Sequence, residues 1–170
     1  MASVVVSNHS SIDEGSFKLT DRAVVRSSSG TVYALWWKTI TGNNVAFSIA
    51  KGNSVHHPTS FSDTDSPSGN GIMTASMAID SEDIIHVLAT RWDSAAHGAQ
   101  HDARHYTYHT VDAATNPDTW QVNELIANTT HAAGNQIGQG CAIAVDVNDD
   151  VHVVYHDNIT NMGTDYDTAY

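Results

Sequence analysis

The stretch Ala142-Ile-Ala-Val-Asp-Val-Asn-Asp-Asp-Val-His-Val-Val-Tyr-His156 decides the fold, because an earlier stretch, Ser76-Met-Ala-Ile-Asp-Ser-Glu-Asp-Ile-Ile-His-Val-Leu-Ala-Thr90, has the same plan. Each has an apolar strand that ends in Asp, a short acidic turn, a His six residues after the Asp, and a second apolar strand. A looser copy runs from Arg22 to Trp37, with 26–30 as its turn and Tyr33 near the His position. Repetition at intervals of tens of residues is typical of solenoids, propellers and arrays.

Short apolar runs rich in Val, Ile, Thr, Tyr and Trp, bounded by Gly, Asn, Asp and Ser, predict strands and turns throughout the chain. We therefore expect an all-β fold with few or no helices. The expected strands lie near 22–26, 31–37, 45–50 and 54–61 in the first unit, 76–80, 84–90, 104–111 and 120–126 in the second, and 141–146, 151–156 and 166–170 in the third.

The second strands of the repeats carry apolar residues in succession, as in Ile84-Ile85 and Val153-Val154. A sheet with one face in water would alternate apolar and polar residues, and so would the two sheets of a sandwich. Blades of a propeller are covered on both faces. The pattern favours antiparallel, four-stranded blades of a β-propeller.

The spacing of the repeats sets the expected domain organisation. Arg26 to Asp80 spans 54 residues and Asp80 to Asp146 spans 66 residues, each about the length of a four-stranded blade with long loops. We expect one domain over 1–170, with blade units at about 20–61, 72–127 and 138–170, and with 1–19 giving a strand to a neighbouring blade. A closed propeller needs at least four blades. About three blades are therefore an incomplete set, and we expect self-association or another chain to complete the propeller.

These residues resemble the family of sialidase-like (BNR-type) β-propellers. The resemblance is carried by Ala144-Val-Asp and Val151-His-Val-Val-Tyr155, and by Thr115-Asn-Pro-Asp-Thr-Trp120. The family places a Ser-x-Asp-x-Gly-x-Thr-Trp box at a turn between the outer strands of a blade. Thr119 and Trp120 match that box, whereas Pro117 stands in the place of its Gly. The resemblance spans most of 22–170 and implies a propeller fold.

Charge and composition exclude several classes of function. The net charge is −12, and the chain has only seven Lys and Arg residues, so it lacks the basic footprint that nucleic acid requires. No apolar run is long enough for a transmembrane helix, so we expect no membrane insertion.

The start at 1–7 lacks the features of a signal peptide, so the protein starts in the cytoplasm or a leader lies outside this sequence. An extracellular or virion-surface setting, such as a phage appendage, fits the function proposed below. Cys141 has no partner for an intrachain disulfide and is expected to be a small buried residue.

The chain has eleven His residues, which raises the question of a metal. His97, His101, His105 and His109 follow one another at intervals of four, as metal ligands on a helix do. The alternation in 103–110 indicates a strand instead, so we expect no metal. If a metal were bound, His97 and His101 would be its ligands, with Asp93 or Asp102. The acidic turn at 146–150 has the beginning of a calcium loop but lacks its Gly and its closing acid, and we expect no cofactor.

His86 and His152 occupy the same position in two repeats. We interpret them as structural, with a ring nitrogen bonded to a carbonyl or carboxylate of the turn. The alternative is that they face an axial channel and bind a ligand there.

The exits of the second strands are the best candidate for a binding site. Trp36-Trp37-Lys38, Arg91-Trp92-Asp93 and Tyr155-His156-Asp157 are expected at equivalent positions, each leading into a loop. Aromatic faces stack on the apolar side of a sugar, and polar neighbours bond its hydroxyls. The alternative is that the Trp side chains pack between blades. The candidate ligand-binding residues are Trp92, Arg91, Asp93, Trp37, Tyr155, His156, His86 and His152.

We interpret the chain as a glycan-binding or surface-recognition module with a carbohydrate ligand. The first alternative is a fragment of a polysaccharide-degrading propeller enzyme, a glycoside hydrolase or a lyase, and the second is a structural assembly protein. A sialidase needs three Arg on the substrate carboxylate, and the chain has only Arg22, Arg26, Arg91 and Arg104. A lyase site could combine His86, Arg91 and Tyr106. No catalytic residue can be assigned from the sequence, which favours a protein without enzymatic activity.

Overall fold

The structure is a computed structural model that describes residues 18–19, 24–41, 44–55, 58, 60–64, 71–93, 100–130, 136–158 and 167–169. All regular elements in these ranges are β-strands, and no helix there could span a membrane. The strands are β1 (Lys18–Leu19), β2 (Val24–Arg26), β3 (Thr31–Thr41), β4 (Asn44–Val55), β5 (Phe61–Asp63), β6 (Ile72–Ile79), β7 (Ile84–Asp93), β8 (Gln100–His109), β9 (Thr119–Thr130), β10 (Gln136–Val145), β11 (Val151–Asn158) and β12 (Asp167–Ala169).

Within the described residues the strands form three sheets. The first sheet has the order β2-β3-β4-β5, the middle sheet β1-β6-β7-β8-β9, and the third sheet β10-β11-β12. All pairings are antiparallel except that of β1 with β6, which is parallel. The prediction of an all-β fold with antiparallel sheets, one of them four-stranded, is confirmed. The strand expected near 54–61 is wrong in its bounds, because β4 extends to Val55 and the next strand begins at Phe61.

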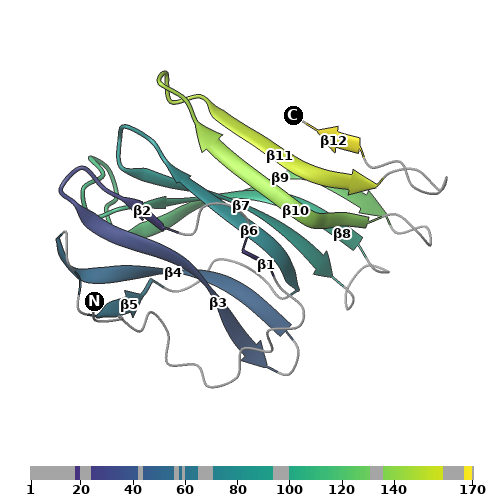
Figure 1. Ribbon diagram of the computed structural model, residues 1–170, viewed down its shortest axis with the longest axis horizontal. Helices are drawn as coiled ribbons and strands as arrows, with labels where there is room; N and C mark the ends of the chain where they lie inside the picture. Colours follow the sequence, from purple (N-terminus) through teal and green to yellow (C-terminus); the bar gives the residue numbers. More distant parts are fainter. Residues whose placement is uncertain are drawn as a thin grey trace.

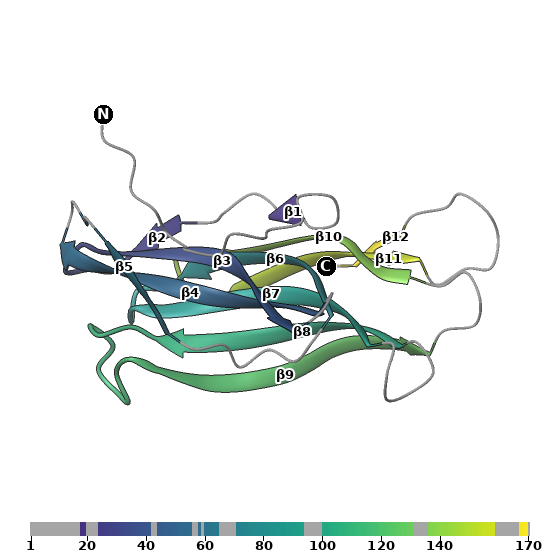
Figure 2. The ribbon, with the colours of Figure 1, turned by 90° about the horizontal axis from the view of Figure 1, so that it is seen from below.

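The three sheets follow one another in space as they do in sequence. In Figure 1 the first sheet lies at the lower left, the middle sheet at the centre and the third sheet at the upper right, with their long strands roughly aligned. Figure 2 shows β9 at the outer edge of the middle sheet, away from β6.

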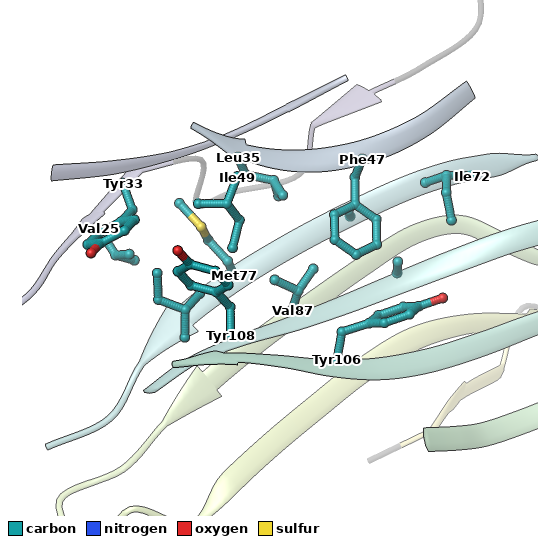
Figure 3. Close-up of a cluster of buried hydrophobic side chains, with 13 residues drawn as sticks. Val25, Tyr33, Leu35, Phe47, Ile49, Ile72, Met77, Val87, Tyr106 and Tyr108 are labelled. Carbon is teal, nitrogen blue, oxygen red and sulfur yellow. The ribbon is translucent and has the colours of Figure 1, made fainter. Parts of the chain in front are cut away.

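Two apolar clusters join the three sheets. The larger one lies between the first and the middle sheet, where Leu35 and Phe47 face Val87 and Tyr106 (Figure 3). The smaller one joins Ala78 and Leu88 of the middle sheet to Cys141 and Ile143 of the third sheet. Because neighbouring residues of a strand point to opposite faces, Val87 and Leu88 enter different clusters. The middle sheet is therefore covered on both faces, as its successive apolar residues predict.

Aromatic residues dominate the larger cluster. Phe47 meets Tyr106 and Trp120 edge to face, with ring centroids 5.0 and 5.7 Å apart, and Trp120 also meets Tyr108 at 5.1 Å. Such tilted contacts suit the ring quadrupoles. Trp120 is the second residue of β9, which follows the loop at 110–118.

The turns at 27–30, 80–83 and 146–149 share one backbone hydrogen-bonding plan. The first residue donates its N–H to the residue four places on, at 3.0, 3.0 and 3.1 Å in Ser27, Asp80 and Asp146. The fourth residue has a positive φ, of 94° in Gly30, 63° in Asp83 and 64° in Asp149. Ser27, and not Arg26, is therefore the counterpart of Asp80 and Asp146. The sequence alignment of the first repeat is wrong by one residue, and Tyr33 then stands six places after Ser27, at the His position.

Candidate functional site

The predicted ligand-binding residues divide between two ends of the sheets. The turn end is defined by the turns at 27–30, 80–83 and 146–149, and the exit end by the ends of the second strands at 36–38, 91–93 and 155–158. His86 lies near the turn end of β7, and Arg91 lies five residues further on, about 17 Å along an extended strand. The structure therefore does not bring His86 and His152 together with the other candidates.

At the exit end, Arg91 is held by a buried carboxylate. Arg91 and Asp102 are opposite each other in β7 and β8, and Arg91 donates from Nε to Oδ1 at 3.1 Å and from Nη2 to Oδ2 at 2.6 Å. Arg104 donates from Nε to Oδ2 of Asp102 at 3.0 Å. Asp102 is only 6% exposed. This two-point pairing fixes the plane of the Arg91 guanidinium group.

Sequence reasoning did not find this Arg91–Asp102–Arg104 cluster. No local pattern in the sequence identifies it, because it depends on the register of β7 and β8, which places Arg91 opposite Asp102. The side chains of Arg91 and Arg104 are 20% and 23% exposed.

Tyr106 lies on the same face of β8 as Asp102 and Arg104, in the core between the first and middle sheets. Burial raises the pKa of Tyr106 to about 12, although the guanidinium groups of Arg104 and Arg91 act in the opposite direction. Its hydroxyl is therefore protonated at neutral pH. His86 lies on the opposite face of the middle sheet, because it alternates with Val87, which faces Tyr106. The lyase site that combines His86, Arg91 and Tyr106 is therefore wrong.

The other candidates at the exit end are placed only in part. Trp37, Trp92, Asp93 and His156 lie in strands β3, β7 and β11, but their side chains lie outside the described part of the structure. Tyr155 is half-buried and packs against the cluster between the middle and third sheets.

The three exit triplets are not all at equivalent positions. Counted from the first residue of each turn, Arg91 is eleven residues on, level with Lys38 and Asp157. Trp92 therefore lies three residues beyond the position shared by Trp36 and Tyr155. The expected equivalence holds for the first and third triplets and is wrong for the middle one.

At the turn end, both repeated His residues bond the first Asp of their own turn. His86 Nε2 lies 3.1 Å from Asp80 Oδ2, and His152 Nε2 lies 3.4 Å from Asp146 Oδ2. The other oxygen of each Asp accepts two N–H groups of its turn. The amides of Asn148 and Asp150 hold the pKa of Asp146 below its usual value. The expected bond from a ring nitrogen to a turn carboxylate is present in both repeats.

His105 extends the middle one of these pairs into a chain of three residues. Its Nε2 lies 3.0 Å from His86 Nδ1, and the two rings are parallel within 5°. When His86 donates from Nε2 to Asp80, its Nδ1 accepts from Nε2–H of a neutral His105. Burial, and then the charge of His86, lowers the pKa of His105, against the opposite effect of Glu124. The strand interpretation of 103–110 is confirmed, since β8 places His105 on the face opposite Tyr106.

The turns of successive sheets are joined by a repeated pair of hydrogen bonds, which we call a rung. Ser28 donates from N and Oγ to Asp83 at 2.7 and 2.5 Å. Ser81 donates from the same two atoms to Asp149 at 2.9 and 2.5 Å. The hydroxyl and then the amide of Ser81 lower the pKa of Asp149. The second residue of one turn thus binds the fourth residue of the next turn. Each rung therefore joins two different sheets.

The first turn is also tied to the loop at 110–118 of the middle sheet. Ser27 and Ser29 each donate a hydroxyl hydrogen bond to Asp112 Oδ2 at 2.5 Å, and Tyr33 Oη accepts from Val111 N at 3.2 Å. These bonds show that the turn-end polar residues link neighbouring sheets.

Among the described residues, no group of three or more His, Cys, Asp or Glu is placed to hold a metal ion. His97 lies outside the described residues, as does the side chain of His101.

Comparison of the chain with protein-family models, with curated proteins and with solved structures finds no match. The candidate site is therefore defined by its own geometry. Polar residues at the turn end form hydrogen bonds between sheets. At the exit end, the buried carboxylate of Asp102 orients the side chains of Arg91 and Arg104.

Proposed function

We propose that the protein is a glycan-binding module that recognises sugar at its exit end, around Arg91 and Trp92. The observation that carries this proposal is the pairing of Arg91 with Asp102 at 2.6 and 3.1 Å. An Arg held in this way presents its guanidinium group at low cost in side-chain entropy, because the group is ordered before a ligand arrives. Trp92 follows Arg91 directly in β7, so the two positions lie on opposite faces of the strand, and the sugar binds at the end of β7, where both faces can be reached. Asp93 follows Trp92.

The chemistry of these residues suits a sugar better than other small ligands. A Trp ring covers the apolar face of a pyranose, Arg donates hydrogen bonds to its hydroxyls or to a carboxylate, and Asp accepts hydrogen bonds from hydroxyls. A guanidinium group can also bond a carboxylate at two points, which favours a glycan that carries a carboxylate. The strongly negative remainder of the chain weakens non-specific binding to other polyanions.

We also infer that the three sheets are successive blades of a propeller-type array. The argument rests on the repeat itself: sheets in sequence order, covered faces on the middle sheet, and one rung between each pair of neighbouring turns. In such an array the exits of equivalent strands gather at one end, which supports recognition of an extended ligand by residues from several sheets.

A glycan array with the full chain tests the proposal. We expect binding to a subset of glycans, with acidic sugars among them. Arg91→Lys keeps the charge but loses the two-point geometry, and should weaken binding about tenfold. The matched control is His152→Ala, whose side chain lies at the turn end and is 63% exposed; it should bind like the unchanged chain. Absence of binding to any glycan, or equal losses in the two variants, would show the proposal to be wrong.

A further inference from the structure

The outer face of the third sheet repeats the face of the middle sheet on which the third sheet itself packs. Ala78 in the middle sheet and Ala144 in the third sheet each lie two residues before the first Asp of their turn. Leu88 and Val154 each lie eight residues after it. Ala78 and Leu88 are fully buried against Cys141 and Ile143. Ala144 is exposed and Val154 is half-buried. The outer face of the third sheet thus has small apolar residues at the same positions as the covered face of the middle sheet, but its Ala144 is exposed.

The third turn has a residue at the position from which the first and second turns donate their rungs. Ser28 and Ser81 each give an N–H and a hydroxyl to an Asp in the next turn. Val147 is their counterpart in the third turn, and it is 95% exposed. Its side chain cannot donate, but its N–H keeps one of the two donors of the rung.

His152 supports the same interpretation. His86, its counterpart, is buried beside its Asp, with a side chain only 10% exposed. The side chain of His152 is 63% exposed, and its bond to Asp146 is longer, 3.4 Å against 3.1 Å. The two His residues have the same local sequence position and differ in whether a neighbouring sheet covers them.

From these observations we propose that the outer face of the third sheet binds a further β-sheet repeat of the same kind. The partner presents small apolar residues in the manner of Cys141 and Ile143, and an Asp with positive φ in its first turn that accepts the Val147 N–H. This interface continues the two that the chain already contains, and it is independent of glycan recognition. It would place a sheet on Ala144, Val154 and His152.

A second copy of this chain is a poorer partner by the same criteria. Its Asp83 and Asp149 already accept from Ser28 and Ser81, and its first turn has Gly30 in place of the Asp. The face of its first sheet that corresponds to Cys141 and Ile143 carries Val24, Val32 and Ala34 and lies outside both clusters, but the turn beside that face has no carboxylate to accept the Val147 N–H. A separate repeat with an unengaged Asp meets both requirements.

A tandem extension tests the proposal on the full chain. Residues 136–169 are appended after Tyr170 through a flexible Gly/Ser linker of about 20 residues, whose root-mean-square span is roughly 25 Å. The appended segment is a copy of the sheet that packs on the middle sheet, and it contains its own Asp149. We expect hydrogen exchange of the original Val147 amide to slow at least tenfold, and modification of the original His152 ring to slow as well.

Three variants make the result specific. Ala144→Glu in the original sheet should abolish the protection of Val147, whereas the matched control Ala114→Glu, at an exposed loop position of the middle sheet, should leave it. Val147→Ser restores the hydroxyl of the rung and should increase protection at position 147 further. A second extension, with residues 72–130 and hence Asp83, covers the case in which the first appended segment does not fold.

If neither extension protects Val147, or if Ala144→Glu has no effect, the proposal is wrong. Protection that appears in the unextended chain as its concentration rises would show that the partner is a second copy, which would also overturn it. Glycan binding is measured on the same samples. Loss of glycan binding with intact protection would contradict only the proposed function, and the reverse result would contradict only the docking face.

Discussion

The turn end and the exit end of the sheets use polar residues in opposite ways. At the turn end the same bond recurs between different sheets: Ser28 binds Asp83, and Ser81 binds Asp149, through the same atoms and at nearly the same distances. At the exit end, the position of Arg91 is taken by Lys38 in the first sheet and by Asp157 in the third. A residue that recurs with its partner serves the stacking of sheets, whereas a position that changes chemistry between repeats is not required for that stacking.

The buried network around Asp102 shows how the exit end can be both ordered and variable. Its bonds to Arg91 and Arg104 stay within the middle sheet. A change there need not disturb the neighbouring sheets. The rungs, by contrast, cross from sheet to sheet, so their loss acts on the interfaces themselves. This difference predicts that turn-end substitutions reduce stability alone, whereas exit-end substitutions also reduce binding.

The largest effect is expected from Asp83→Ala at the turn end. The substitution leaves the amide and hydroxyl of Ser28 without their charged acceptor, and it places Ala at a φ of 63°, which a β-carbon disfavours. The free energy of unfolding should fall by about 3 to 5 kcal/mol, since each hydrogen bond to a charged group contributes about 1.5 to 3 kcal/mol. Urea unfolding monitored by tryptophan fluorescence measures it.

Asp83→Asn is the matched control for this substitution. Asn tolerates the left-handed conformation and can still accept one bond, so the loss should be about 1 to 2 kcal/mol. Equal losses in the two variants would mean that the charge, and not the backbone conformation, accounts for the effect. A loss below about 0.5 kcal/mol in both would contradict the structural role of the rung.

Asp102→Ala at the exit end should have the next largest effect. It leaves two partly buried guanidinium groups without their shared carboxylate, which should cost about 2 to 3 kcal/mol of stability, somewhat below the cost of breaking a fully buried pair. Glycan binding should fall as well, because Arg91 loses its fixed orientation. Thermal unfolding and binding isotherms of one preparation give both quantities. Unchanged glycan binding would separate the Arg91–Asp102–Arg104 cluster from the binding site.

The sequence predicts the strands well because the signal for them is local. Apolar runs ending in Asp, followed by a short turn, locate β6, β7, β10 and β11 to within a few residues. The two-faced apolar pattern of β7 likewise predicts that the middle sheet is covered on both sides. Spacing alone is enough for these features, because a strand and its turn are adjacent in the chain.

What the sequence did not predict depends on partners far apart in the chain. Ser28 and Asp83 are 55 residues apart, and Ser81 and Asp149 are 68 residues apart. The contact of His86 with His105 depends on the register of β7 and β8, which a sequence pattern does not fix to one residue. The misplacement of the first turn by one residue has a local cause: Ser27 replaces the Asp that identifies this position elsewhere, and Arg26 stands where the other repeats have Ile79 and Val145.

Trp92→Ala separates the two interpretations of the exit end. If Trp92 stacks on sugar, the substitution should weaken glycan binding by roughly 1 to 3 kcal/mol, the scale of an aromatic stacking contact, and leave the melting temperature nearly unchanged. If Trp92 packs between sheets, it should instead cost about 3 to 5 kcal/mol of stability. Melting curves and binding isotherms of this one variant decide between the two, and a large loss of stability would remove Trp92 from the proposed site.

The smallest effect concerns the response of the turn end to mild acid. Burial holds the pKa of His105 below its ordinary value of 6.5, so the folded protein binds fewer protons at this residue than the unfolded chain does. The stability contributed by neutral His105 is complete above pH 6.5 and is lost as the pH falls through the lowered pKa of the folded state. Protonation of His105 adds a proton at Nδ1 and keeps the Nε2–H that bonds His86, so the loss of stability comes from burying a charged ring.

We therefore expect stability to decrease modestly between pH 7 and pH 5, before Asp149 and Asp112 become protonated. Both of those carboxyl groups have a lowered pKa, so their contribution is lost only at more acidic pH. Urea unfolding at a series of pH values should show the first decrease in the unchanged chain and not in His105→Gln, which cannot titrate. The same decrease in His105→Gln would assign the titration to another group. The contact of His105 with His86 would then not account for the change of stability with pH.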